Sequence, residues 1–331
     1  MPESVSHLVS PDDVPGFVCA YRFAADGTAR KLTEQDIDPQ LTSSADEWLW
    51  LHLNFIDQRC ARWLARSGKL TALAIDFIEH VPAYQTIDSF ERETVGSVAE
   101  LRRDFTGETH EACRLHFLLA DGLLVTLRAK PVRSAELIRR QLDAGRRFAG
   151  PAQLLLAFFS HYAQGIESVL HDLAAEIELI EDRVLDDRVS DERRRAVIVR
   201  REAAMLHRQQ RSLRRVLMEA ARGTPAFPAD LTDLLDLHLH LDQEFEQIEH
   251  RARLFHDEID AKLAAETNRQ LYRLSVLTAL FLPPAFVAGL FGMNLDGLPW
   301  TGVPHGFWLA TATAILSSVA TWLFLRYVDR G

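Results

Sequence analysis

The sequence predicts a mixed α+β cytoplasmic domain that leads into a long stalk helix and two C-terminal transmembrane helices. Three observations support this fold class. Within residues 1–150, runs of branched and aromatic residues alternate with stretches of helical periodicity. Residues 229–282 contain neither Gly nor Pro, so one helix can run through them without a break. Residues 271–326 hold two long apolar runs separated by a short polar loop.

The N-terminal domain is expected to cover residues 1–150. Its predicted strands are rich in aromatic and branched side chains, and Asp121-Gly122 lies between two apolar runs where a tight hairpin turn needs it. The expected elements are strands over 14–24 and 48–55, a helix over 57–74, a hairpin over 114–129 and a helix over 133–147.

Residues 151–228 predict an antiparallel pair of charged helices that begins after the break at Gly150-Pro151. Acidic residues gather in the first helix and arginines fill the second, over 193–215. A basic run can indicate nucleic-acid binding, but the chain carries a net charge of −10. We therefore expect a mostly solvated pair of oppositely charged helices, and no nucleic-acid partner.

Residues 229–270 predict a cytoplasmic stalk helix with an apolar seam. One set of apolar residues recurs every seven positions, and a second set supplies the neighbouring register. Such a seam needs partner helices, either from the same chain or from copies of it. The two sets are Leu234, Leu241, Ile248 and Phe255, and Phe245, Ala252 and Ile259.

The C-terminal segments 271–291 and 307–326 predict two transmembrane helices. The first holds a single charge, Arg273, and its 21 residues span about 31 Å of helix, enough to cross a hydrocarbon core of about 30 Å. Trp300, Trp308, Trp322 and Tyr327 lie near the ends of the runs, as aromatic belts do. The alternative is a pair of buried helices in a large soluble core.

The distribution of basic residues predicts the orientation. Lys and Arg flank both spans, whereas the loop over 292–306 contains neither. By the positive-inside rule, both termini are cytoplasmic and the loop faces outward. The first twenty residues lack a signal-peptide pattern, and the three cysteines lack metal-ligand spacing. We expect a multi-pass protein of the cell's inner (plasma) membrane.

One stripe of the first span carries nearly all of its uncharged polar side chains, which favours a pore-lining face. Two helices cannot enclose a path, so a pore requires several copies of the chain. Small residues at Ala310, Ala314 and Ser318 offer a surface for close helix approach. Pro283-Pro284 leaves the carbonyls of Ala279 and Leu280 without their usual helical donors, and the alternative to a pore is a kink buried in lipid. The predicted pore-lining residues are Asn268, Leu271, Ser275, Thr278, Leu282, Ala285 and Gly289.

The outward loop is the predicted selectivity element, formed by Gly292, Met293, Asn294 and Asp296. The glycine permits a tight backbone, the amide of Asn294 offers a neutral oxygen, and Asp296 adds one negative charge per chain. A ring of such loops would contact the water shell of a cation, and its acids would raise the local cation concentration. His305 is a candidate softer ligand for a metal.

Phe291-Gly292-Met293-Asn294, at the outer end of the first of two C-terminal spans, resembles the signature of the CorA superfamily of divalent-metal transporters. The layout of the whole chain is also similar. Within the superfamily the chain looks most like the ZntB zinc transporters, because Asp296-Gly297-Leu298-Pro299 follows the motif and Trp50-Leu51-His52-Leu53-Asn54 is similar to a ZntB segment.

The resemblance implies a CorA-like homopentamer in the lipid bilayer that transports Zn²⁺, with possible coupling to protons. It also implies that an acidic, histidine-bearing stretch of the stalk faces emerging ions, with Asp257 as the best single metal contact and His256 and Asp260 beside it. Imidazole and carboxylate ligands suit Zn²⁺. This stretch comprises His238, His240, Asp242, Glu246, His250, His256, Asp257, Glu258 and Asp260.

Two alternatives stay open: a CorA-type Mg²⁺/Co²⁺ channel, and a coiled-coil scaffold anchored by a membrane hairpin without a pore. An enzyme with a catalytic cofactor is not expected. The sequence contains no Gly-rich phosphate loop, and the cluster Glu108, His110, Glu111 and His116 lacks two histidines one helical turn apart.

Overall fold

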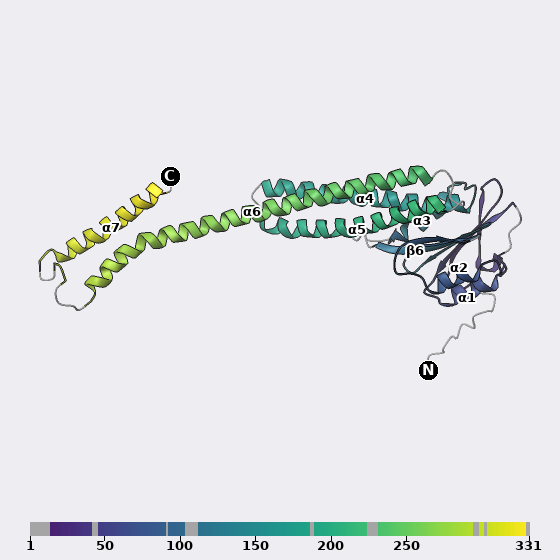
Figure 1. Cartoon of the computed structure of the whole chain (residues 1–331), viewed down its shortest axis with the longest axis horizontal. Helices are drawn as coiled ribbons and strands as arrows, with labels where there is room; N and C mark the ends of the chain where they lie inside the picture. Colours follow the sequence, from purple (N-terminus) through teal and green to yellow (C-terminus); the bar gives the residue numbers. More distant parts are fainter. Residues whose placement is uncertain are drawn as a thin grey trace, which may run out of the picture. The chain divides into compact units, whose positions relative to one another are not determined.

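The computed structural model describes residues 14–41, 46–90, 92–102, 112–185, 189–223, 231–293, 298–300 and 303–328. Its contacts divide the chain into two compact units, Met1–Leu254 and Phe255–Gly331. The first unit holds a sheet with helices on both faces and a bundle of long helices (Figure 1). The second unit holds the end of one long helix and the helix that follows it.

A seven-stranded sheet in the order β2-β1-β3-β7-β6-β5-β4 forms the centre of the first unit. Only the β3–β7 pair is parallel among the pairs of this sheet, and the remaining neighbours are antiparallel. Gly122 takes φ 67° in the turn between β6 and β7, as the predicted Asp121-Gly122 hairpin requires. The strands are β1 Phe17–Phe23, β2 Ala29–Leu32, β3 Trp48–Asn54, β4 Thr86–Ser89, β5 Thr94–Leu101, β6 Ala112–Ala120 and β7 Leu123–Arg128.

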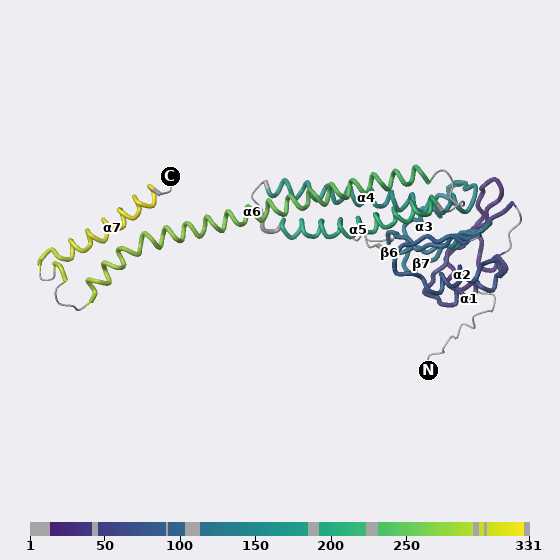
Figure 2. The backbone as a smooth tube through the Cα atoms, in the orientation of Figure 1, coloured from purple at the N-terminus to yellow at the C-terminus, as the bar shows by residue number. Residues whose placement is uncertain are grey.

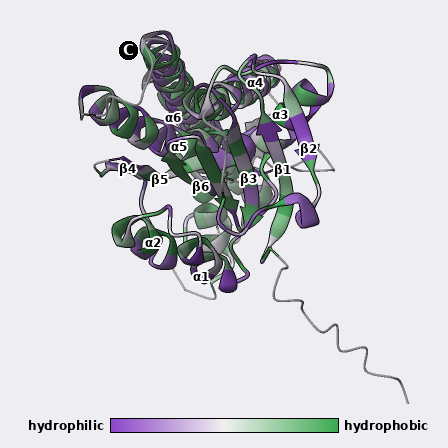
Figure 3. Cartoon of the chain, turned by 90° about the vertical axis from the view of Figure 1, so that its right-hand side faces the viewer, coloured by the Kyte–Doolittle hydropathy of each residue, from purple (hydrophilic) through white to green (hydrophobic). Residues whose placement is uncertain are grey.

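Helices cover both faces of this sheet, so the central strand β3 is buried on both sides. Helices α1 (Arg59–Arg66) and α2 (Ala72–Glu79) pack on one face, where Trp63 and Leu64 join a cluster of buried apolar residues. Figure 3 shows α3 (Arg133–Asp143) and α4 on the opposite face. On that face Trp50 meets Phe158 of α4 with ring centroids 5.8 Å apart.

The helix predicted over 57–74 is wrong as a single element. Helix α1 ends at Arg66, and Gly68 takes φ 67° before α2 begins at Ala72, capped by the Thr71 side chain. The left-handed backbone at Gly68 cannot continue a right-handed helix. Strands β2, β4 and β5 are absent from the sequence-based expectation.

Three long helices continue from the sheet and run side by side within the first unit (Figures 1 and 2). They are α4 (Pro151–Leu185), α5 (Val189–Gly223) and the first part of α6 (Leu231–Phe291). The predicted seam of α6 is buried: Leu241 and Phe245 are fully inaccessible, and Ile248 and Ala252 nearly so. Its partners in the first unit are α4 and α5 of the same chain, as the Glu181–Arg251 and His207–Asp242 contacts show.

Candidate functional site

The apolar hairpin of the second unit, formed by the end of α6 and by α7 (Gly306–Val328), has the length and composition of two membrane spans. The most apolar window of each helix has no residue buried in the protein. Phe281 is 62% exposed and Trp308 is 70% exposed, which would be costly in water but not in lipid. This exposure contradicts the alternative of two buried core helices.

One face of α6 lies against α7. Half-buried residues recur on α6 at Ala279, Leu280, Pro283 and Val287, at helical spacing. On α7 most half-buried positions are small residues, among them Ala310, Ala314, Ser317, Ser318 and Thr321. The face of small residues on α7, which the sequence predicts for close helix approach, therefore contacts α6 of the same chain.

Ser318 of α7 donates a hydrogen bond to a backbone carbonyl of α6 that the proline pair leaves without its usual donor. A proline at position 284 cannot donate to the carbonyl of Leu280 four residues earlier. The Ser318 hydroxyl lies 3.3 Å from that carbonyl oxygen and donates to it, and it is equally distant from the Ala314 carbonyl of its own helix. A neighbouring helix thus satisfies a backbone group freed by proline within the apolar span, as a span in hydrocarbon requires.

The predicted pore stripe lies on the opposite face of α6, away from α7. All seven of its residues, from Asn268 to Gly289, are exposed in the single chain. At 3.6 residues per turn they fall within an arc of about 100°, and Asp257 lies within the same arc. Leu274, Ser275, Thr278, Ala279 and Leu282 line a shallow groove of about 390 Å³ on this side.

The polar groups of the stripe remain neutral. Thr278 donates its hydroxyl to the Leu274 carbonyl at 2.9 Å, which leaves the lone pairs of its oxygen for another donor or a cation. Leu271 and Leu282 are 56% and 66% exposed, so each presents an apolar surface at its level of the stripe.

Two residues of the predicted selectivity loop lie at the C-terminal end of α6. Gly292 donates to the Ala288 carbonyl at 2.9 Å, and Met293, 49% exposed, donates to Leu290 at 3.3 Å, so both continue the last turn of α6. Asn294 and Asp296 lie outside the described residues. Phe291 stacks on Trp300 across the loop with ring centroids 6.1 Å apart, and His305 is exposed just before α7.

The predicted stalk ligands do not converge within one chain. Asp257 is exposed, while His256 and Asp260 pair with each other, with 3.6 Å between Nε2 and Oδ2. Across the described parts of the chain, no group of three or more His, Cys, Asp or Glu side chains could hold a metal ion. Of the cluster Glu108, His110, Glu111 and His116, the first three lie outside the described residues and His116 is buried in β6.

Two members of the acidic, histidine-bearing stretch are buried, contrary to expectation. His238 and Asp242 are buried against α5. The Gln210 amide donates to His238 Nδ1 at 2.6 Å, and burial lowers the pKa of His238 to about 4. Because its ring is buried and its Nδ1 is occupied, His238 is not a ligand for ions outside the bundle.

Asp242 belongs to a buried ionic network that the sequence analysis missed. His207 of α5 places Nε2 3.0 Å from Asp242 and Nδ1 2.8 Å from Glu249, and Arg214 lies 3.2 Å from Asp242. The His207 ring also stacks on Phe245 at 5.4 Å. The heptad spacing already places Asp242 beside the apolar seam and so indicates that it is buried. Its partner on α5 depends on how the two helices pack, which the sequence does not show.

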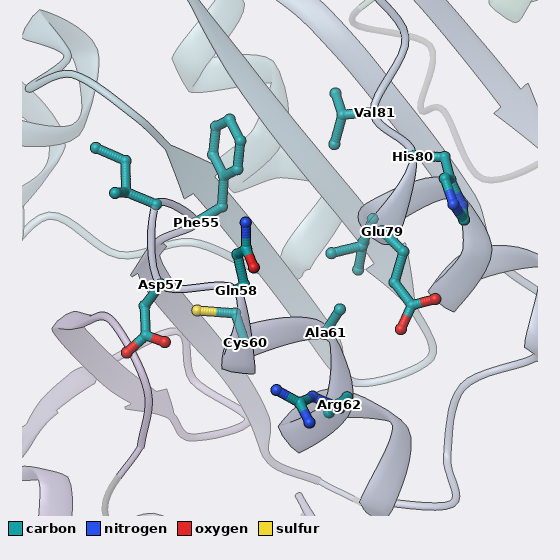
Figure 4. Close-up of a pocket in the computed structure, with 11 residues that line it drawn as sticks. Phe55, Asp57, Gln58, Cys60, Ala61, Arg62, Glu79, His80 and Val81 are labelled. Atoms are coloured by element: carbon teal, nitrogen blue, oxygen red, sulfur yellow. The ribbon is translucent and has the colours of Figure 1, made fainter.

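The first unit has a hollow of about 890 Å³ between the end of β3 and helices α1 and α2 (Figure 4). Asp57 at its rim is held by Arg59 at 2.7 Å. The Cys60 thiol donates to the Pro15 carbonyl at 3.0 Å, and burial raises its pKa to about 11. Such a thiol is a poor nucleophile and a poor metal ligand at neutral pH.

The sequence also matches a known family over most of its length. The profile of the family described as CorA-like Mg²⁺ transporter protein matches residues 45–326. The chain belongs to this CorA-like family. Its members are transporters rather than enzymes, which removes both the enzyme and the scaffold without a pore from consideration and leaves a divalent-cation transporter.

Among CorA-like relatives, the divalent cation transporter CmaX of Pseudomonas aeruginosa is 26% identical over 327 residues, covering 95% of this chain and 97% of the relative. The zinc transport protein ZntB of Pectobacterium carotovorum is 24% identical over 322 residues, covering 93% and 94%. The solved structure of full-length CmaX superposes with a TM-score of 0.81 at 22% identity over 97% of this chain and 99% of that chain. The CorA magnesium transporter of Methanocaldococcus jannaschii gives 0.76 at 18% identity over 93% and 98%.

Proposed function

We propose that this CorA-like chain forms a homopentameric pore in the inner membrane and carries Zn²⁺ in preference to other divalent cations. The observation that carries the proposal is the position of the α6 stripe. Its seven residues face away from α7 and are exposed in the single chain. A ring of copies with α6 inside would turn these stripes toward a common axis and leave the apolar faces of α7 to lipid.

The outward loop, the stripe and Asp257 then have successive roles along the path of the cation. The ring of Asn294 and Asp296 attracts hydrated cations at the outer mouth, with both termini of the chain in the cytoplasm. Ser275 and Thr278 supply neutral oxygens, and Leu282 narrows the path with an apolar ring. At the inner end, Asp257 from each copy forms an acidic ring, so the metal contact that one chain does not build arises between chains.

The preference for Zn²⁺ is supported by the similarity to ZntB and by the Asp296-Gly297-Leu298-Pro299 loop. Histidine and carboxylate side chains on the exposed part of α6, such as His250 and Asp257, suit a borderline-soft cation better than they suit Mg²⁺. Mg²⁺/Co²⁺ conduction is the second candidate, favoured by the family description itself. The proposal includes a proton gradient as a driving force of the Zn²⁺ transport.

The test is metal flux into liposomes that contain the purified full-length chain, with Zn²⁺, Co²⁺ and Mg²⁺ compared at equal concentration and with or without a pH gradient. Zn²⁺ uptake that Asn294→Ala abolishes, while the oligomer stays intact, supports the proposal. The matched control is Gln243→Ala, which removes an exposed amide from α6 outside the predicted pathway. Mg²⁺ uptake without Zn²⁺ uptake would establish the second candidate, and liposomes impermeable to all three metals would refute both.

A further inference from the structure

Helix α5 carries a row of exposed arginines with a strict seven-residue period. The five residues are Arg194, Arg201, Arg208, Arg215 and Arg222, and each is exposed in the single chain. They extend over 28 intervals of sequence, or about 42 Å of helix. Because seven residues fall about 20° short of two full turns, the row winds slowly around α5, as the contact line between two helices crossing at about 20° does. We call these five residues the arginine row.

The arginine row has no ionic partner among the described residues. The oppositely charged helices α4 and α5 do form ion pairs, but these involve other residues: Arg195 with Glu176 at 3.2 Å, and Arg183 with Glu192 at 3.1 Å. The expected charge matching between the two helices is therefore confined to one end of the pair. Along the rest of α5 the five arginines of the row face outward, whereas Arg214 contacts Asp242 of α6.

The arginine row is flanked by apolar side chains. Val197, Ile198 and Met205 are 39%, 54% and 36% exposed, and all three lie beside the row on α5. A face that serves only for solubility has no need of exposed branched residues between its arginines. Apolar positions bordered by like charges are the pattern of a helix-packing surface whose edges select the partner.

Helix α4 carries an acidic counterpart on its own outer face. Glu167, Glu178 and Asp182 are exposed and lie within an arc of about 60°, and none has an ion pair with the described residues. Leu179 beside them is 47% exposed. We call Glu167, Glu178 and Asp182 the α4 acids. They extend over 15 intervals, or about 22 Å, close to the length from Arg201 to Arg215.

We propose that the arginine row of one chain docks on the α4 acids of a second copy of the chain. The inference rests on the proposed homo-oligomer and assigns one of its interfaces. Two unlike, complementary faces on one chain form a heterologous contact, and such contacts close into rings when repeated by rotation. In a ring with α4 and α5 in its outer layer, α5 of each copy adjoins α4 of the next. A nucleic acid is a poorer partner, because the chain has a net charge of −10 and the α4 acids would repel it.

The experiment uses the full-length chain in detergent and follows the fraction of oligomer during heating and dilution, by light scattering after size exclusion. The first variant is R201E/R208E/R215E. Losing three exposed pairs, at about threefold each, weakens one contact about thirtyfold, and the reversed charges add repulsion. We expect this variant to dissociate at lower temperature and at higher protein concentration than the wild type.

The decisive variant adds E167R/E178R/D182R to the same chain, which restores the net charge and reverses both faces. We expect it to recover most of the lost oligomer stability. The matched control is R62E/R66E/K69E, three exposed basic residues on and after α1, which should assemble like the wild type. Circular dichroism checks that each variant keeps its helices.

The inference is overturned if R201E/R208E/R215E assembles like the wild type, or if the combined reversal recovers nothing. Neither outcome depends on transport. If the wild type carries Zn²⁺ and R201E/R208E/R215E still assembles like it, only this interface is refuted. If the wild type itself is monomeric, the proposed pore is refuted.

Discussion

Replacing Asp242 by leucine tests how far the buried ionic network fastens α6 to α5. The carboxylate is 9% exposed and faces the His207 ring at 3.0 Å and the Arg214 guanidinium at 3.2 Å. Asp242→Leu leaves both groups in the helix interface without this acceptor. Removing one partner of a buried pair costs about 3–5 kcal/mol. The Arg214 side chain is 28% exposed and regains some water, so we expect a loss of about 2–3 kcal/mol.

The assay is thermal unfolding of the full-length chain in detergent, at neutral pH. For a unit of this size, 1 kcal/mol corresponds to about 2–4 °C, so the melting temperature should fall by about 5–10 °C. Asp236→Leu is the matched control, since Asp236 is an exposed acid on the same helix. Combining Asp242→Leu with His207→Phe should recover part of the loss, because two apolar side chains can pack in place of the carboxylate and the imidazole. A fall no larger than that of Asp236→Leu would refute the reasoning.

Three further predictions follow from single contacts. Burial raises the pKa of the Glu100 carboxyl from 4.5 to about 7, so the folded state binds the proton more tightly and the wild type loses stability as the pH rises between those values. The melting temperature of Glu100→Gln should therefore rise relative to that of the wild type from pH 5 to pH 7, and a difference that stays constant with pH would contradict this. Ser318→Ala should lower the melting temperature in detergent by the equivalent of about 0.6–1.5 kcal/mol through the lost bond to α6, whereas Ser317→Ala, whose hydroxyl donates within its own helix at 2.7 Å, should change it little. Gly16→Ala should lower the free energy of unfolding by about 2 kcal/mol or more, because the added Cβ would collide with the backbone carbonyl oxygen of Asn54. Gly68→Ala is the control, since it has the same backbone strain but open space around the Cβ, and equal losses of stability for the two variants in thermal unfolding would contradict the clash.

The membrane hairpin could be predicted from composition because its solvent is lipid. A run without charge over 307–325 needs no knowledge of its neighbours to be assigned to a bilayer, and the exposed apolar side chains of α7 agree with it. The stripe predicted to line a pore likewise follows from the helical period of α6. What the sequence could not supply is the direction of that stripe relative to α7, since either face of α6 could have packed on the second span.

Within the first unit, the sequence predicted correctly those strands and turns whose own residues form a clear pattern. Strand β3 and the β6–β7 hairpin were predicted from β-branched and aromatic content and from the Asp121-Gly122 turn, and both are confirmed. Strand β5 was missed although it is buried throughout, because Thr94–Leu101 includes Gly96 and Glu100 and shows neither alternation nor a uniform apolar run. Gly96 is accommodated because the ring of Phe117, on the neighbouring strand, occupies the place of its side chain.

The sequence alone determined the order of the parts: a mixed domain, a charged helical pair, a heptad stalk and an apolar hairpin that ends its first span in Gly292-Met293. These depend on composition and periodicity, which are properties of short segments. Only the tertiary structure decided which charges meet. Asp242 became a buried partner of His207 while Asp257 on the same helix stayed exposed, because burial depends on the helices α4 and α5 that pack beside α6, and their contacts link residues far apart in the chain.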